Sequence, residues 1–117
     1  MIEGTWQVVH AELAGEALPE FVAAKVALEF AGNRYVVRFD GAVTDRGTYA
    51  ISVARDHATL VLHGESGSNA GRTIAGIFLL RGDRLRVCYG LDGTPPTEFA
   101  TAAGQQRYLA TYRRQAT

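Results

Sequence analysis

A predicted β-hairpin over residues 71–91 constrains the fold of this sequence more than any other feature. Two alternating apolar runs, 74–80 and 85–89, flank a turn at Gly82 and Asp83. Glycine and aspartate tolerate the positive φ angles that a tight hairpin turn needs. Gly76 lies within the first run, and a glycine in a strand often marks a bend by which a sheet curves into a barrel. We therefore predict the central hairpin of an antiparallel sheet.

The other segments predict more hairpins of the same kind. Apolar and polar residues alternate in stretches 2–13, 26–30, 34–39, 47–53, 59–63 and 106–114. Pro19 and Glu20 have the positions typical of a first helical turn, so we predict a short helix near residues 19–25. We expect its apolar residues Phe21 and Val22, together with the preceding Leu18, to cover one mouth of the barrel. The glycine- and serine-rich stretch 64–71 predicts the most flexible connection. Together these segments predict an all-β, up-and-down barrel of about eight antiparallel strands, with one short helix after the first strand.

Composition narrows the class of protein further. The chain has 117 residues, 47% of them hydrophobic, which suits one domain over residues 1–117. Twelve basic and twelve acidic side chains give zero formal charge, and the basic ones are scattered apart from Arg113–Arg114, so we expect no nucleic-acid partner. The single cysteine cannot form an intrachain disulfide. No leader-like segment and no apolar run of membrane-spanning length is visible, so we expect a cytoplasmic protein.

Short motifs along most of the chain resemble a known family. Gly4-Thr5-Trp6 on the first strand resembles the Gly-x-Trp signature of lipocalins. More closely, the sequence is similar to a small lipocalin-like (calycin) domain of unknown function that is common in planctomycetes. The matching positions are Gly4-Thr5-Trp6, Gly47-Thr48-Tyr49, Ile77-Phe78, Gly82-Asp83-Arg84-Leu85, Cys88-Tyr89, Gly93 and Pro96-Thr97-Glu98-Phe99.

The resemblance implies a lipocalin-like barrel in which Trp6 packs under a basic residue of the last strand, Arg113 or Arg114. The family pattern has an arginine where this chain has Pro95, so a role tied to that arginine does not carry over. The wider calycin group contains binders of apolar small molecules and a few cyclases and isomerases. The resemblance therefore supports the fold and names no particular reaction.

Nine residues are the candidate wall of a ligand site inside the barrel. They are apolar or aromatic residues on strand faces that we expect to point inward, with one histidine: Trp6, Val8, His10, Leu28, Phe30, Tyr35, Tyr49, Phe78 and Tyr89. His10 is the candidate with most chemistry, because the two-residue strand period places it on the face of Trp6, and a histidine exchanges protons near neutral pH. The alternative is that the strand twists or ends first and leaves His10 inert at the rim.

The remaining reactive residues predict little chemistry. His57 and His63 fall in a turn and at a strand end, and their spacing does not suggest a metal site. Cys88 alternates with Val87 and Tyr89, which predicts a buried, unreactive thiol. The tyrosines lie mostly on inward faces, where a hydroxyl either orients a ligand or belongs to ordinary core packing. We assign no catalytic residue, metal or cofactor from the sequence.

Three functions fit this pattern. The first is binding of a small apolar or aromatic molecule in the barrel interior, entered past residues 16–25 or 92–99. The second is a small-molecule cyclase or isomerase that uses the same pocket, since holding a substrate in a reactive geometry needs no sequence motif. The third is a structural or interaction barrel with a filled core, in which an exposed strand face forms a homodimer. The sequence does not decide whether the protein is an enzyme.

Overall fold

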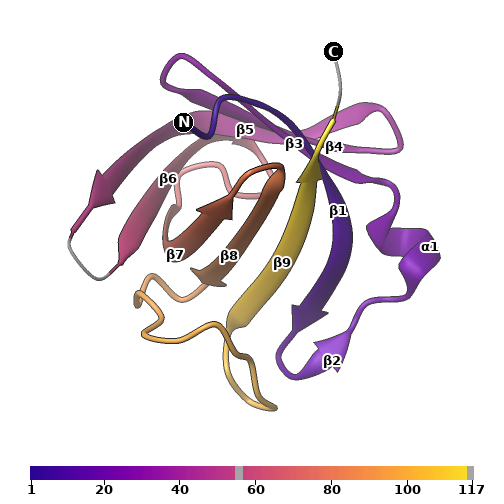
Figure 1. The fold of residues 1–117 in the computed structure, drawn as a ribbon, viewed down its shortest axis with the longest axis vertical. Coiled ribbons are helices and arrows are strands. Elements are labelled where there is room, and N and C mark those ends of the chain that lie inside the picture. The colour runs from indigo at the N-terminus through magenta and orange to yellow at the C-terminus, as the bar shows by residue number, and fades with distance from the viewer. Residues whose placement is uncertain (55–56, 116–117) are drawn as a thin grey trace.

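Eight strands pair in chain order and close into an antiparallel barrel in the computed structural model, which describes residues 1–54 and 57–115 (Figure 1). A ninth strand of two residues, β2, pairs with the end of β1. The predicted all-β barrel with one short helix after the first strand is therefore confirmed. In chain order the elements are β1 (Gly4–Leu13), β2 (Glu16–Ala17), α1 (Glu20–Ala23), β3 (Val26–Ala31), β4 (Arg34–Phe39), β5 (Ala42–Val53), β6 (Ala58–Gly67), β7 (Thr73–Arg81), β8 (Arg84–Gly90) and β9 (Arg107–Arg114).

Tight turns set the register of three hairpins. Arg81 pairs with Arg84, which leaves Gly82 and Asp83 as the two-residue turn of the β7–β8 hairpin. Ala31 pairs with Arg34 around Gly32–Asn33, and Phe39 pairs with Ala42 around Asp40–Gly41. Gly82, Gly32 and Asp40 have φ angles of 58°, 61° and 52°, the left-handed conformation that these turns demand. The turn residues thus account for the up-and-down order of the strands.

Two connections differ from the prediction. The stretch 64–71 was expected to be a flexible loop, but β6 continues to Gly67, and backbone hydrogen bonds between Gly64 and Arg72 and between Gly71 and Gly64 close the turn that follows. The helix α1 was expected to cover a mouth with Phe21. Instead Phe21 is 70% exposed, and Ala23 is the buried residue of this helix. The other two predicted residues, Leu18 and Val22, are partly buried, and Leu18 packs against the core. A single turn of helix has room for only a narrow inner face, and the small alanine occupies it.

Closure of the barrel depends on β1, which pairs with β3 at its start and with β9 along most of its length. The β1–β9 register shifts between Val8 and His10, which is a β-bulge. Because a bulge adds one residue to a strand, the side chains after it point to the opposite face of the sheet from the one that strict alternation predicts. Trp6 and Val8 therefore point inward, and after the bulge Ala11 takes the inward position.

Trp6 closes the end of the barrel near the two chain termini. Its side chain has no exposed surface, and its indole Nε1 donates a hydrogen bond to the carbonyl of Ile2 at 2.9 Å. The guanidinium of Arg114 lies over the ring, 4.2 Å from the ring centroid, in cation–π geometry. Arg114 also donates hydrogen bonds to the carbonyls of Met1 and Glu3. The basic residue that the resemblance placed over Trp6 is therefore Arg114.

The segment between β8 and β9 covers the outside of the barrel. Cys88 points away from the interior and is nevertheless fully buried, with its Sγ 3.8 Å from the carbonyl oxygen of Ala100. A Cβ added to Gly90 would lie 1.8 Å from the carbonyl oxygen of Thr94, so only glycine permits this close approach. The predicted buried position of Cys88 is confirmed, and the cover comes from a loop rather than from the core.

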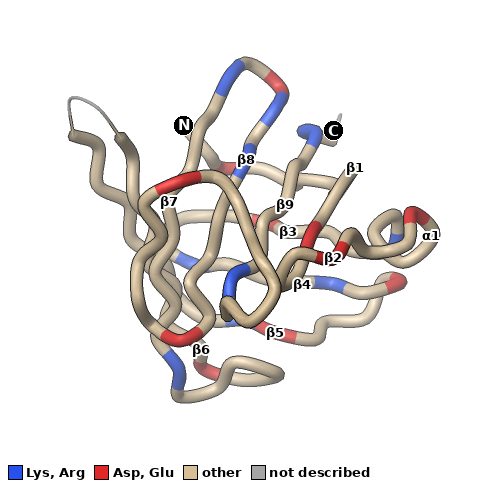
Figure 2. Tube along the Cα trace, turned by 90° about the horizontal axis from the view of Figure 1, so that it is seen from below, with Lys and Arg blue, Asp and Glu red and all other residues tan. Residues whose placement is uncertain are grey.

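Strand pairing also gathers basic side chains that the sequence separates. Arg84 lies between Arg81 and Arg113 in the cross-strand register, and all three are exposed. Figure 2 shows these basic positions at the β7–β8 turn and near the end of β9. Like charges directly opposite each other in a sheet are unfavourable. The chain is neutral overall, but its surface charge is not evenly distributed.

We expect Trp6→Ala to lower the free energy of unfolding by about 3–5 kcal/mol, because the substitution removes a fully buried ring and leaves a cavity under Arg114. Urea unfolding followed by circular dichroism measures this, since Trp6 is the single tryptophan and a fluorescence probe would be lost with it. The control is Val9→Ala on the same strand, where the side chain is 42% exposed and the change should stay within about 0.5 kcal/mol. Equal stability of the two variants would contradict the packing described here.

Cys88 should not react with an aromatic disulfide reagent in the folded protein at pH 8. Burial raises the pKa of this thiol, and the segment that ends near Ala100 blocks access to it. Reaction should be complete within minutes once urea unfolds the chain. The control is Ser52→Cys in a Cys88→Ala background, because Ser52 is exposed on β5. Fast reaction of Cys88 in native buffer would show that the covering segment opens.

Candidate functional site

A cavity of about 200 Å³ lies inside the barrel at the end where β3, β5, β7 and β9 begin. It opens at the mouth of the barrel, beside the turn that joins β6 to β7. Most of its wall is aliphatic or aromatic, and the remaining lining residues carry a carboxylate, an amide and two hydroxyls. The lining residues are Val26, Leu28, Val37, Thr44, Asp45, Leu62, Ser68, Asn69, Ile74, Tyr89, Leu91, Tyr108 and Tyr112. We call this the barrel cavity.

Cross-strand pairs build the apolar wall of the barrel cavity. Leu28 of β3 lies opposite Val37 of β4, and Leu62 of β6 lies opposite Ile74 of β7. Each residue occupies an inward position of its strand, because side chains alternate between the two faces. These side chains are shorter than the aromatic residues at the other end of the barrel, and the space between them remains open.

Three tyrosines form the side of the cavity on β8 and β9. Tyr89 lies opposite Tyr108 in the strand register, and the two rings stack with their centroids 5.7 Å apart. The hydroxyls of Tyr89 and Tyr112 are 2.9 Å apart and share a hydrogen bond. Burial raises the pKa of all three phenols. At neutral pH they are neutral groups that donate and accept hydrogen bonds.

Asp45 is the buried polar residue of the cavity wall. Its side chain lies on β5 and the residue is 4% exposed. The Tyr35 hydroxyl donates to Oδ2 at 3.2 Å, and the Asn69 side-chain amide donates to the same oxygen at 2.8 Å. The Asn69 backbone N–H donates to Oδ1 at 3.4 Å. Burial, followed by the negative charge of Asp45, raises the pKa of Tyr35, so this phenol keeps the proton that it donates.

Two of the nine sequence-predicted residues line the barrel cavity, namely Leu28 and Tyr89. Five others lie in or against the packed core: Trp6, Val8, Phe30, Tyr35 and Tyr49. Within this core the rings of Phe30 and Tyr49 meet edge to face, 4.6 Å apart. Phe78 is buried and lines a second hollow. Most of the predicted wall is therefore packed core, and Leu28 and Tyr89 belong to the same buried core while they border the open space.

His10 lies outside the barrel, so the prediction that it points inward is wrong. Its side chain is 55% exposed, and its Nε2 is 3.6 Å from Oε2 of Glu12. The reason is the β-bulge between Val8 and His10, which shifts the inward–outward alternation by one residue, so that His10 points outward. The alternative interpretation, in which His10 lies inert at the rim of the barrel, is closer to the observed position. The cause of that position is the bulge, not a twist or the end of the strand. His10 is not available as an acid or base inside the cavity.

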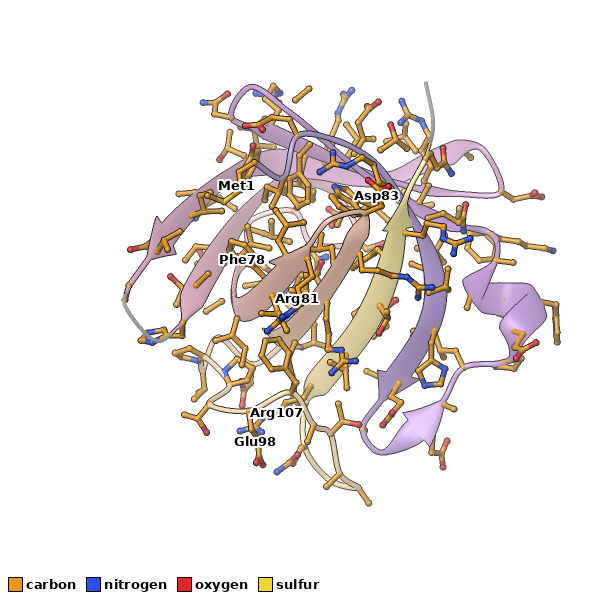
Figure 3. The ribbon with its side chains drawn as sticks, viewed as in Figure 1. Met1, Phe78, Arg81, Asp83, Glu98 and Arg107 are labelled. Atoms are coloured by element: carbon orange, nitrogen blue, oxygen red, sulfur yellow. The ribbon has the colours of Figure 1, made fainter. Side chains whose placement is uncertain are left out.

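The second hollow, of about 900 Å³, is an open depression at the other end of the barrel. It extends from the barrel rim to the outer face of β7, where Ile77 and Leu79 meet the segment 95–99. Figure 3 shows Met1 and Phe78 on this side. No residue of the predicted entrance segments 16–25 and 92–99 lines the barrel cavity; residues Pro95, Pro96, Thr97 and Phe99 line the second hollow instead. Among residues 1–54 and 57–115, no carboxylate lines the second hollow, whereas Asp45 and Asn69 converge in the wall of the barrel cavity.

The sequence interpretation missed Asp45 and Asn69. A usable signal existed for Asp45, because it shares the strand parity of Gly47, Tyr49 and Ile51. Alternation would therefore have placed its carboxylate inside the barrel. Asn69 gave no such signal, since it lies in the stretch interpreted as a flexible loop. Tyr108 and Tyr112 belong to the tyrosines that we expected to lie mostly on inward faces, but the sequence interpretation did not assign them to the site.

The described residues contain neither a metal-binding cluster of side chains nor a membrane-spanning helix. Within residues 1–54 and 57–115, no group of three or more His, Cys, Asp or Glu side chains is arranged to hold a metal ion. No helix in the same ranges is long and apolar enough to cross a membrane.

Comparison of the chain with protein-family models, curated proteins and solved structures finds no match.

The buried tyrosines predict a distinct alkaline behaviour. All five tyrosines have a raised pKa, with burial as the main cause, whereas in the unfolded chain they ionise near pH 10. The unfolded state therefore releases phenolic protons first, so stability should be independent of these groups below about pH 10 and fall above it. Tyrosinate absorbance at pH 10.5 should be small in native buffer and large in urea. Full ionisation of the folded protein near pH 10 would contradict the burial described here.

Proposed function

We propose that the barrel binds a small, mainly apolar molecule with one aromatic ring in the barrel cavity. The observation that carries this proposal is an opening inside the barrel whose wall is apolar on most sides and holds a few converging polar groups. Such a combination is typical of small-molecule sites.

The volume of the cavity limits the size of the ligand. Drug-sized ligands occupy pockets of about 300–1,000 Å³. An apolar cavity of about 150 Å³ accommodates a benzene molecule. At about 200 Å³, the barrel cavity suits a single ring with one short substituent. A polycyclic or long-chain ligand would have to extend out of the mouth.

A lipocalin-like assignment supports the proposal at the level of fold, and we propose it together with the function. The closed barrel and the cation–π contact of Arg114 on Trp6 are what the resemblance implies. Ligand binding inside a small eight-stranded barrel is one of the uses of this architecture. Fold alone does not determine function, so the proposal depends on the cavity.

The alternatives differ in what they require of the interior. A cyclase or isomerase could not use His10 to polarise a substrate in the barrel cavity, because His10 lies outside the barrel. A tyrosine of the barrel cavity would have to replace it. A structural barrel with a filled core requires the cavity to stay empty of ligand. Binding measurements separate this third function from the first.

The direct test is to titrate benzyl alcohol into ¹⁵N-labelled protein and follow amide shifts. We expect shifts at Leu62, Ile74 and Tyr89, with a dissociation constant of about 1 mM or tighter, which is about 4 kcal/mol and well within the efficiency of small ligands. Native mass spectrometry of the purified protein, followed by denaturing extraction, identifies any molecule that copurifies.

A matched pair of variants checks the location. Leu62→Phe fills the barrel cavity and should abolish binding, whereas Val43→Phe enlarges a side chain that is 50% exposed on the neighbouring strand and should leave binding intact. Overpacking costs about 1–3 kcal/mol, so circular dichroism must show that both variants fold. Unchanged amide shifts with the parent protein, and no copurifying molecule, would favour the structural barrel.

A further inference from the structure

We infer that the ligand of the barrel cavity carries a protonated amine, which forms an ion pair with the Asp45 carboxylate. This inference rests on the proposed function and adds the chemical class of the ligand. It begins with the position of the carboxylate: Asp45 is 4% exposed, and it forms part of the cavity wall rather than of the outer surface. Aspartate is seldom buried to this degree without a partner of opposite charge.

The described part of the chain supplies no such partner. Among residues 1–54 and 57–115, no arginine, lysine or histidine nitrogen lies within 4.0 Å of the Asp45 carboxylate. Its neighbours on β4 and in the β6–β7 turn, Tyr35 and Asn69, are neutral donors. Hydrogen bonds from neutral donors stabilise a carboxylate, but they do not cancel its charge. A buried charge without a counter-ion is costly in a low-dielectric interior.

The carboxylate also keeps capacity to accept further hydrogen bonds. Two carboxylate oxygens offer about four acceptor positions. Oδ2 receives the two shorter bonds, from Tyr35 and from the Asn69 amide, while Oδ1 receives a single bond of 3.4 Å. An ammonium group supplies both the missing positive charge and donors for the unused acceptor positions, since it has three N–H donors.

The rest of the cavity fits the same class of ligand. Tyr89 and Tyr108 bring aromatic rings to the wall, and aromatic faces attract cations. The aliphatic side chains Leu62 and Ile74 suit the apolar body of the molecule. A carboxylate or phosphate ligand would meet the charge of Asp45, and none of the described residues that line the cavity is basic and could offset the repulsion. Aromatic amines of one ring therefore match both the volume and the charge.

Asp45 also has a structural role, because its bonds to Asn69 hold the β6–β7 turn. That role needs hydrogen-bond acceptors but makes no demand on ligand charge. The two roles are separated by comparing probes of equal size that differ in charge. Benzylamine is cationic at neutral pH, benzyl alcohol is neutral and benzoate is anionic.

The experiment measures the dissociation constants of these three probes by amide shifts and by calorimetry, first with the parent protein. We expect benzylamine to bind at least tenfold more tightly than benzyl alcohol, and benzoate to bind more weakly than either. In Asp45→Asn, benzylamine should weaken at least tenfold while benzyl alcohol changes less than threefold. The matched control is Asp40→Asn, which removes an exposed carboxylate in the β4–β5 turn at the same end of the barrel and should leave all three constants unchanged.

Each outcome decides a separate point. Equal affinity for benzylamine and benzyl alcohol overturns the amine inference and leaves the proposed function standing. A benzylamine preference that survives in Asp45→Asn also overturns it, because the charge would then act elsewhere. No binding by any probe overturns both. If Asp45→Asn does not fold, two measurements still support or overturn the inference. They are the affinities of the three probes for the parent protein and the loss of benzylamine binding in Leu62→Phe.

Discussion

The pairing of β1 with β9 is the constraint on which the rest of the structure depends. It joins the first and last strands, so the sheet has an inside only when this pairing forms. Arg114 strengthens the closure from β9 by covering Trp6 of β1 and by donating hydrogen bonds to the carbonyls of Met1 and Glu3. The bulge after Val8 then decides which β1 side chains are inside. One closing contact therefore sets both the core and the exclusion of His10.

Side-chain size explains why one half of the barrel is filled and the other is open. Around Trp6 the inward positions hold Phe30, Tyr35 and Phe78, which are large and almost fully buried. At the opposite end the inward positions of β3, β4, β6 and β7 hold shorter aliphatic residues such as Val37 and Ile74. The barrel cavity lies between them and the three tyrosines of β8 and β9. The number of strands sets the diameter of a closed barrel, and eight strands leave an interior that side chains can fill. The residues chosen at each end therefore determine whether the interior is packed or hollow.

Local patterns predicted the fold well because hairpin turns are short-range features. Gly32–Asn33 and Gly82–Asp83 set their own registers, and alternation placed Leu28 and Tyr89 inside. The bulge beside His10 was not visible, since it arises from the register against a strand about a hundred residues away. The row of Arg81, Arg84 and Arg113 was hidden for the same reason. Long-range register is what the sequence pattern does not contain.

The site depends on the connection that sequence analysis interpreted as flexible. Asn69 supplies two of the three donors to Asp45, so the position of the carboxylate depends on the conformation of the β6–β7 turn. The same turn borders the cavity through Ser68 and Asn69. A ligand that neutralises Asp45 therefore interacts with a group that also holds the mouth in place. Since such coupling acts equally in both directions, order in the turn favours binding, and binding favours order in the turn.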